Sequence, residues 1–163
     1  PFHKLNVIYH PLQNKHFDRL FIRMRTRLGN GLYPMKDTVR CMVRDRHEVT
    51  ATAFIADQTP SPEHAYWTTF LHQDTPVFWG TETIARKLDR PVVYLGLDQP
   101  RRGHYTMRFE LLEADPATTQ EGAISERHTR RLEEDIRMRP ALWLWTHRRW
   151  KHGGREPFTG RIR

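Results

Sequence analysis

One stretch of the sequence, Val49-Thr-Ala-Thr-Ala-Phe-Ile-Ala56, restricts the fold more than any other. Small and β-branched side chains occupy both sets of alternating positions in it. A strand with one face in water alternates apolar with polar residues, whereas a strand covered on both faces does not need to. The stretch therefore predicts a strand inside a parallel sheet that is covered by helices.

Strand-like and helix-like segments alternate along the rest of the chain. The predicted strands are 5–9, 49–56, 91–97 (also buried) and 105–111 (an antiparallel partner), with a short extended piece at 66–71. The predicted helices are 14–28, a shorter one within 34–46, one through 85–88 capped by Thr81 or Thr83, and one over 124–138. This order predicts an α/β fold with a mixed, largely parallel sheet flanked by helices.

The first predicted helix has a clear apolar face. The residues on that face are Phe17, Leu20, Phe21, Met24 and Leu28. We expect Asn14 to cap the helix and its apolar face to cover a core. Arg25 lies at the edge of that face, where an arginine can reach over a sheet edge and hold an anion. The alternative is a surface arginine whose stem packs on its apolar neighbours.

The bulk composition limits the class of protein. With 163 residues, 37% of them hydrophobic, the chain is long enough for one domain with a real core. We expect a single α/β domain over residues 1–152 and a flexible basic tail over 153–163. No apolar run approaches the roughly 20 residues that cross a bilayer, and there is no signal-peptide pattern.

Charge and metal-ligand chemistry narrow the possible partners. The formal net charge of +8 favours anionic partners such as phosphates, lipid head groups or nucleic acid. Cys41 is the only cysteine, and we expect it to be a buried apolar side chain. The 10 histidines show no metal-ligand spacing on one helix face, so we expect neither a metal nor a cofactor.

Two short segments are candidates for a binding site. Asp57 and Gln58 follow the predicted strand 49–56 directly, and ligands of open α/β sheets bind at the carboxyl ends of strands. Asp57 can orient a base or bind a substrate hydroxyl, or it can simply cap a loop. Thr81 and Thr83 open a predicted helix, whose free amides can bind phosphate unless the threonines are plain caps.

The segment from Pro140 to Lys151 combines three tryptophans with several cations. As a helix it would place Trp143, His147 and Trp150 in one stripe beside Leu144, Arg148 and Lys151. Indole rings beside cations fit a phospholipid or lipid A head region, or stacked nucleic acid. The alternative is a terminal helix whose tryptophans pack inward.

Several of these segments, taken in order, resemble the late acyltransferases of lipid A biosynthesis. The matching stretches are Tyr9-His-Pro-Leu-Gln-Asn14, Arg25-Thr-Arg27-Leu-Gly29, Ala56-Asp57-Gln58, Thr81-Glu-Thr83-Ile-Ala85-Arg86 with Pro91-Val-Val93, and Trp143-Leu-Trp-Thr-His-Arg-Arg-Trp-Lys151. The resemblance implies a partial glycerolipid acyltransferase-like fold. It also implies that the intact protein acts on the cytoplasmic face of the bacterial inner membrane. It implies an acyl carrier protein or acyl-CoA donor and a lipid A precursor as acceptor.

From the residues and the resemblance together we expect specific roles. Arg25 would hold an anion or oxyanion, and Asp57 would support the site geometry. The expected substrate-binding residues are Gln58, Thr81, Thr83, Arg148, Arg149 and Lys151. The last three would meet lipid phosphates and the anionic inner-membrane surface. The rival hypothesis is a non-enzymatic basic module that binds nucleic acid. If the chain is an acyltransferase, we expect no nucleic acid partner.

The resemblance also implies a catalytic His-x4-Asp/Glu motif, and the chain departs from the family there. The only literal match is His128 with Glu133, inside the predicted helix 124–138. Five residues of helix rotate by about 140°, so we expect the two side chains to diverge and the match to be coincidental. We therefore expect the chain to be the C-terminal part of such an enzyme, soluble or peripheral, and inactive alone.

Overall fold

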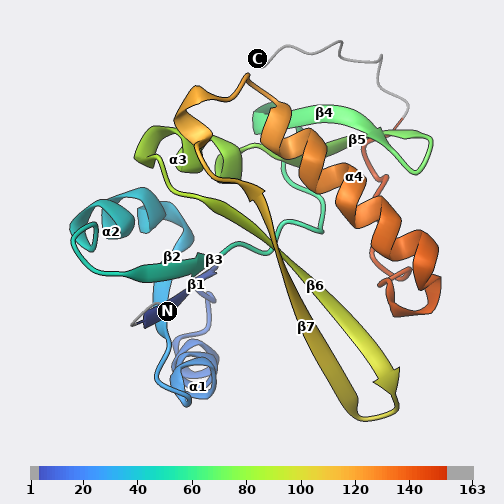
Figure 1. Cartoon of the computed structure of the whole chain (residues 1–163). Helices are drawn as coiled ribbons and strands as arrows, with labels where there is room; N and C mark the ends of the chain where they lie inside the picture. The colour runs from blue at the N-terminus through green and yellow to red at the C-terminus, as the bar shows by residue number, and fades with distance from the viewer. Residues whose placement is uncertain (1–3, 154–163) are drawn as a thin grey trace. The chain divides into compact units, whose positions relative to one another are not determined.

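The computed structural model describes residues 4–153, which belong to two compact units (Figure 1). The chain passes from the first unit to the second after Ile55. The single domain expected over 1–152 stays a prediction. The expected tail lies outside the described residues, apart from Gly153.

The first unit is built on a three-stranded parallel sheet with the strand order β2-β1-β3. The strands are β1 (Lys4–Tyr9), β2 (Gly31–Pro34) and β3 (Thr50–Ala53). Helix α1 (Lys15–Thr26) connects β1 to β2, and α2 (Thr38–Arg44) lies between β2 and β3. Both pairings of β1 are parallel, so the predicted parallel sheet is confirmed. The expectation that residues 49–56 form a covered inner strand was wrong, because β3 lies at the edge of the described sheet and none of its residues is buried.

Helix α1 begins as predicted but does not cover a core. The Asn14 side chain accepts hydrogen bonds from the backbone N–H groups of His16 (3.0 Å) and Phe17 (3.3 Å). The apolar face is nevertheless open, with Phe17 57% and Met24 59% exposed, and α1 has no buried residue. The expectation of a covered core was wrong because periodicity shows which side chains suit burial, not whether a partner surface is present.

The second unit begins with a hairpin formed by β4 (Ala65–Phe70) and β5 (Gln73–Phe78). Leu71 and His72 make its two-residue turn, and both have positive φ values, 47° and 65°. Hairpins favour such a turn because its twist matches that of the strands, although Asn or Gly usually fills these positions. No local pattern indicated β5, because Pro76 and the absence of typical turn residues before it both argue against a strand.

A longer hairpin follows, formed by β6 (Val92–Arg101) and β7 (His104–Glu113). The antiparallel partner strand predicted at 105–111 is confirmed. The expectation that residues 91–97 are buried was wrong, because Val93, Leu95 and Leu97 are exposed and, within residues 4–153, β6 pairs with β7 alone. Only the alternate side chains, such as Tyr94, face inward.

Two helices complete the second unit: α3 (Gly80–Leu88) and α4 (Ala123–Met138). The buried apolar residues come from both hairpins and both helices: Ala65, Phe70, Val77, Ala85, Tyr94, Ile124 and Ile136. With the parallel sheet of the first unit, these elements confirm the α/β class.

The segment after α4 is not the predicted helix. A 3-10 turn over Pro140–Leu142 is followed by bends and turns up to Gly153. The backbone hydrogen bonds there span two or three residues, for example from Trp145 N–H to Trp143 C=O at 2.9 Å. The tryptophan and cation stripes expected from a helix therefore do not form. Within residues 4–153, no helix has the length and apolar character needed to span a bilayer.

Candidate functional site

A small cavity of about 30 Å³ lies within the second unit, where the end of β5, the start of α3 and the helix α4 come together. Its lining residues are Ala56, Val77, Phe78, Thr81, Glu82, Val92, Ile124, Ser125 and His128. That volume holds about one water molecule. Ala56, the residue before Asp57, and Thr81 at the start of α3 both line this cavity, whereas Asp57 and Gln58 are not among its lining residues.

Asp57 lies close enough to His128 and Arg149 to influence their ionisation. Burial lowers the pKa of His128, the Asp57 carboxylate opposes that shift, and the Arg149 cation adds to it. Burial also lowers the pKa of Arg149, to about 10, and Asp57 again opposes the shift. His128 is therefore a neutral imidazole at neutral pH, facing a cavity that also has hydroxyl groups on its wall.

Glu82 forms the polar wall of the cavity, although its side chain is only 1% exposed. One carboxylate oxygen accepts the backbone N–H of Gly122 at 2.7 Å. The other accepts the backbone N–H and the hydroxyl of Ser125, at 2.8 and 2.7 Å. Glu82 thus satisfies free amides at the start of α4, the part of a helix that attracts negative charge.

The two threonines at the start of α3 differ in their surroundings. Thr81 lines the cavity, whereas the Thr83 hydroxyl donates to the Trp79 carbonyl at 3.1 Å, inside its own helix. Gln58, which was expected to bind substrate, is exposed. Glu82 lies in the first turn of α3, but its carboxylate accepts hydrogen bonds from the start of α4 and not from the amides of α3.

Arg149 is held by the protein itself. It is 2% exposed, and its Nη1 donates to the Pro76 carbonyl at 2.8 Å and to the Thr59 hydroxyl at 3.3 Å. Its guanidinium lies 5.4 Å from the ring centroid of Phe70. Arg148 and Lys151, in contrast, are exposed. The basic group expected from the sequence is therefore split into one buried cation and two cations open to solvent.

Two of the three tryptophans of the same segment, Trp143 and Trp150, pack inward, whereas Trp145 is 55% exposed. The ring centroids of Trp143 and Trp150 lie 6.0 and 6.1 Å from that of Phe70 in β4. Thr59 adds to this attachment by donating its hydroxyl to the Arg149 carbonyl at 2.8 Å. Because these rings face Phe70, they do not form the open stacking platform that nucleic acid binding requires.

Arg25 belongs to the first unit. Its guanidinium lies 5.7 Å from the ring centroid of Phe21, one turn earlier on α1, and the residue is exposed. This is the geometry of an arginine packed along the surface of its own helix.

The two residues of the literal His-x4-Glu match diverge, as predicted. The His128 ring lies against Tyr94, with 5.7 Å between ring centroids. Glu133 instead accepts the Leu71 N–H at 2.5 Å and pairs with Arg130 at 2.7 Å. In the described part of the chain, no group of three or more His, Cys, Asp or Glu residues is placed to hold a metal ion.

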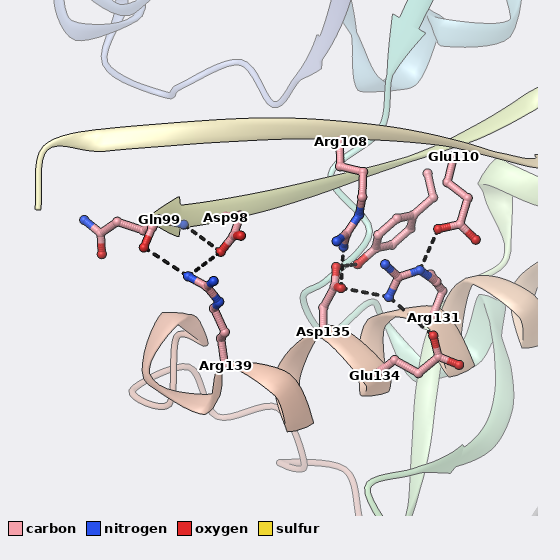
Figure 2. A network of polar contacts seen from close by, with 9 residues as sticks. Asp98, Gln99, Arg108, Glu110, Arg131, Glu134, Asp135 and Arg139 are labelled. Carbon is pink, nitrogen blue, oxygen red and sulfur yellow. Dashed lines mark hydrogen bonds and ion pairs between the residues drawn. The ribbon is translucent and has the colours of Figure 1, made fainter. Parts of the chain in front are cut away.

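Sequence reasoning missed two carboxylates with central structural roles, Glu82 and Asp135. Asp135 accepts hydrogen bonds from Tyr94 at 2.9 Å, Arg108 at 2.6 Å and Arg131 at 2.7 Å (Figure 2). Arg131 and Asp135 are four residues apart, a spacing that predicts an ion pair on one face of a helix. Their link to Tyr94 and Arg108 depends on the hairpin crossing α4, which no local pattern encodes.

An α/β chain with a small cavity between a strand exit and two helix starts belongs to a broad class of ligand-binding and enzyme folds. Comparison with protein families makes the assignment specific. Residues 2–152 match the family of bacterial lipid A biosynthesis acyltransferases, so the chain belongs to that family, and the resemblance noted in the sequence is confirmed. A comparison with curated proteins gave no match. The family acts by acyl transfer in the biosynthesis of lipid A.

Proposed function

We propose that the chain is part of a membrane-associated acyltransferase that moves a fatty acyl group from an acyl thioester to a hydroxyl of a lipid A precursor. The observation that carries this proposal is the family match over residues 2–152. The donor is acyl carrier protein or acyl-CoA, and the site of action is the cytoplasmic face of the inner membrane.

The reaction requires a base and a group that stabilises negative charge. The lipid hydroxyl oxygen attacks the thioester carbonyl carbon and passes its proton to the base, and the carbon–sulfur bond then breaks to release the thiol. A cation near the carbonyl oxygen stabilises the oxyanion formed on the way, the role that we assign to Arg25. Asp57 and Gln58 support the geometry of the acceptor site at the exit of the predicted strand 49–56.

In this proposal, residues 4–153 do not supply the general base. His128 is the histidine next to the cavity, but the acid at family spacing, Glu133, is engaged by Leu71 and Arg130. A cavity of about 30 Å³ is also too small for an acyl thioester. The described residues therefore supply structural support and binding groups, and the proton acceptor is a separate element.

Contact with the lipid substrate involves the exposed cations Arg148 and Lys151 near the end of the described chain. Each cation near an anionic surface contributes about 1 kcal/mol of binding free energy. We assign Arg149, by its buried contacts, to positioning this segment against β4 and β5. Thr81 borders the cavity and is placed to hydrogen-bond a hydroxyl there.

The experiment has two parts. Purified chain is first assayed for acyl transfer from acyl carrier protein to a lipid A precursor, and no turnover is expected because the base is missing. Turnover by the wild-type chain that is lost in His128→Ala would contradict the proposal that the described residues do not supply the general base. The chain is then titrated with the phosphorylated lipid precursor and with random oligonucleotides at several salt concentrations.

The binding assay decides between acyltransferase and nucleic acid module. Saturable binding of the lipid precursor that weakens in Arg148→Ala/Lys151→Ala supports the proposal. The predicted weakening is about 30-fold, from two cations at about 1 kcal/mol each. Tight oligonucleotide binding without lipid binding would contradict it.

A further inference from the structure

The hairpin formed by β6 and β7 carries a continuous apolar face that the described residues leave open. The side chains on this face are Val93, Leu95, Leu97, Tyr105, Met107, Phe109 and Leu111, each between 51% and 65% exposed. They alternate along both strands, and the strand register pairs Val93 with Leu111, Leu95 with Phe109 and Leu97 with Met107. Apolar surface gathered in one place in this way marks an interaction site.

The opposite face of the same hairpin is fixed to α4. Figure 2 shows Arg108 and Glu110 of β7 directed towards Asp135 and Arg131, with Asp98 of β6 directed towards Arg139. The ion-pair distances are 2.6 Å for Arg108–Asp135, 2.7 Å for Glu110–Arg131 and 2.7 Å for Asp98–Arg139. The polar pairs thus orient the hairpin so that its apolar side chains point away from α4.

Gly96 allows this attachment to be close. A Cβ atom at this position would lie 2.9 Å from Nη2 of Arg108 and 3.1 Å from Oδ2 of Asp135. Glycine therefore leaves the space in which Arg108 and Asp135 meet, opposite the exposed side chains of Leu95 and Leu97.

The tip of the hairpin is basic. Arg101 and Arg102 precede Gly103, whose φ of +78° allows the tight turn, and His104 follows. All three flanking side chains are exposed, and neither arginine forms an ion pair among residues 4–153. An apolar strip with aromatic rings and a cationic end matches a lipid interface, where acyl chains lie below anionic head groups.

We propose that the apolar face of the β6–β7 hairpin is a membrane-docking surface that inserts into the head-group region of an anionic bilayer. Leu95, Met107 and Phe109 enter the apolar boundary, while Arg101 and Arg102 reach the lipid phosphates. A second copy of the chain is a poorer occupant because it carries the same net charge of +8.

This inference rests on the membrane association proposed above and assigns it to a different surface. Near the end of the described chain, Trp143 and Trp150 face Phe70, whereas Trp145 is 55% exposed. The hairpin, with its two rows of exposed apolar side chains, offers a larger apolar area than this single indole.

The first experiment measures flotation of the chain with phosphatidylcholine vesicles, with and without phosphatidylglycerol. We expect binding that requires the anionic lipid. Leu95→Ser/Phe109→Ser should weaken it by at least about tenfold, and Arg101→Gln/Arg102→Gln should weaken it by a similar factor at low salt. Val49→Ser is the matched control, since Val49 is 58% exposed and belongs neither to the hairpin nor to the segment that carries Arg148 and Lys151. Thermal unfolding of each variant verifies that the fold is kept.

A second experiment compares the two faces of one strand. In a Cys41→Ser background, Met107→Cys and Thr106→Cys are labelled with a polarity-sensitive fluorophore. These neighbours lie on opposite faces of β7, so only the label at position 107 should report an apolar environment when vesicles are added.

The outcomes separate the docking surface from the wider proposal. Equal flotation of wild type and hairpin variants, with loss in Arg148→Ala/Lys151→Ala, overturns the hairpin surface and leaves membrane association intact. No flotation of the wild-type chain overturns both. Sedimentation showing a dimer that Leu95→Ser/Phe109→Ser dissociates, without lipid present, also overturns the docking proposal.

Discussion

The buried carboxylate of Glu82 in α3 caps the first turn of α4 through Ser125, accepting both its backbone N–H at 2.8 Å and its hydroxyl at 2.7 Å. This contact joins two helices through residues that are 43 positions apart in the sequence. It also fixes the wall of the cavity beside Thr81 and His128.

Replacing Glu82 with glutamine should lower the free energy of unfolding by about 1–3 kcal/mol, because the amide NH2 would face backbone donors and lose hydrogen bonds made by a charged group. Chemical denaturation measures this change. Glu126→Gln is the control, since its ion pair with Arg130 at 3.6 Å is partly exposed and should contribute less than about 1 kcal/mol. Equal destabilisation of the two variants would contradict the capping role.

Arg149→Lys should lower the thermal unfolding midpoint, whereas Arg148→Lys should not. Lysine cannot reproduce the planar group that lies over Phe70 while donating to Pro76, and losing a buried hydrogen bond from a charged group costs about 1.5–3 kcal/mol. Differential scanning calorimetry compares the neighbouring variants directly. An unchanged midpoint for Arg149→Lys would show that the guanidinium geometry is not needed.

Asp135→Asn should destabilise the attachment of the hairpin to α4 by about 2 kcal/mol. The substitution removes the negative charge of the carboxylate that accepts hydrogen bonds from Arg108 and Arg131. Burial acts to raise the pKa of Asp135, but hydrogen bonds from Tyr94 and Arg131 outweigh it and lower that pKa. Hydrogen exchange of β6 and β7 amides should therefore quicken in the variant. The exposed neighbour Glu134, changed to Gln, should leave the exchange rates unchanged.

The stability of the chain should decline as the pH falls below the ordinary histidine value of 6.5. Burial lowers the pKa of His128 in the folded state, so the unfolded chain binds a proton at a higher pH than the folded chain does. The stabilisation is complete above 6.5 and is lost as the pH falls towards the lowered value.

Denaturant titrations of the wild type and of His128→Gln across that pH range test the assignment. The variant should lose part of the pH dependence because it lacks the titrating ring. His104→Gln, at an exposed hairpin position, should keep it. A pH dependence that is the same in all three proteins would assign the effect to other groups.

Local patterns in the sequence determined much of the fold. The Asn14 cap depends on a side chain and two amides that are at most three residues away, so the residue type alone predicts it. The parallel sheet followed from a strand without polar alternation at 49–56, and the hairpin strand 105–111 followed from regular alternation. The family assignment followed from short motifs in a fixed order, and the match over residues 2–152 confirmed it.

The tertiary structure decided which of those patterns found partners. The apolar faces of α1 and of the β6–β7 hairpin had the periodicity of core elements, yet both are open in the described residues. The segment after Pro140 had the composition of an amphipathic helix, but it packs against a hairpin that is distant in the sequence. Trp143 and Trp150 lie against Phe70, and Arg149 donates to the Pro76 carbonyl. Periodicity and capping are set within a few residues, whereas burial depends on surfaces brought together from far apart in the chain.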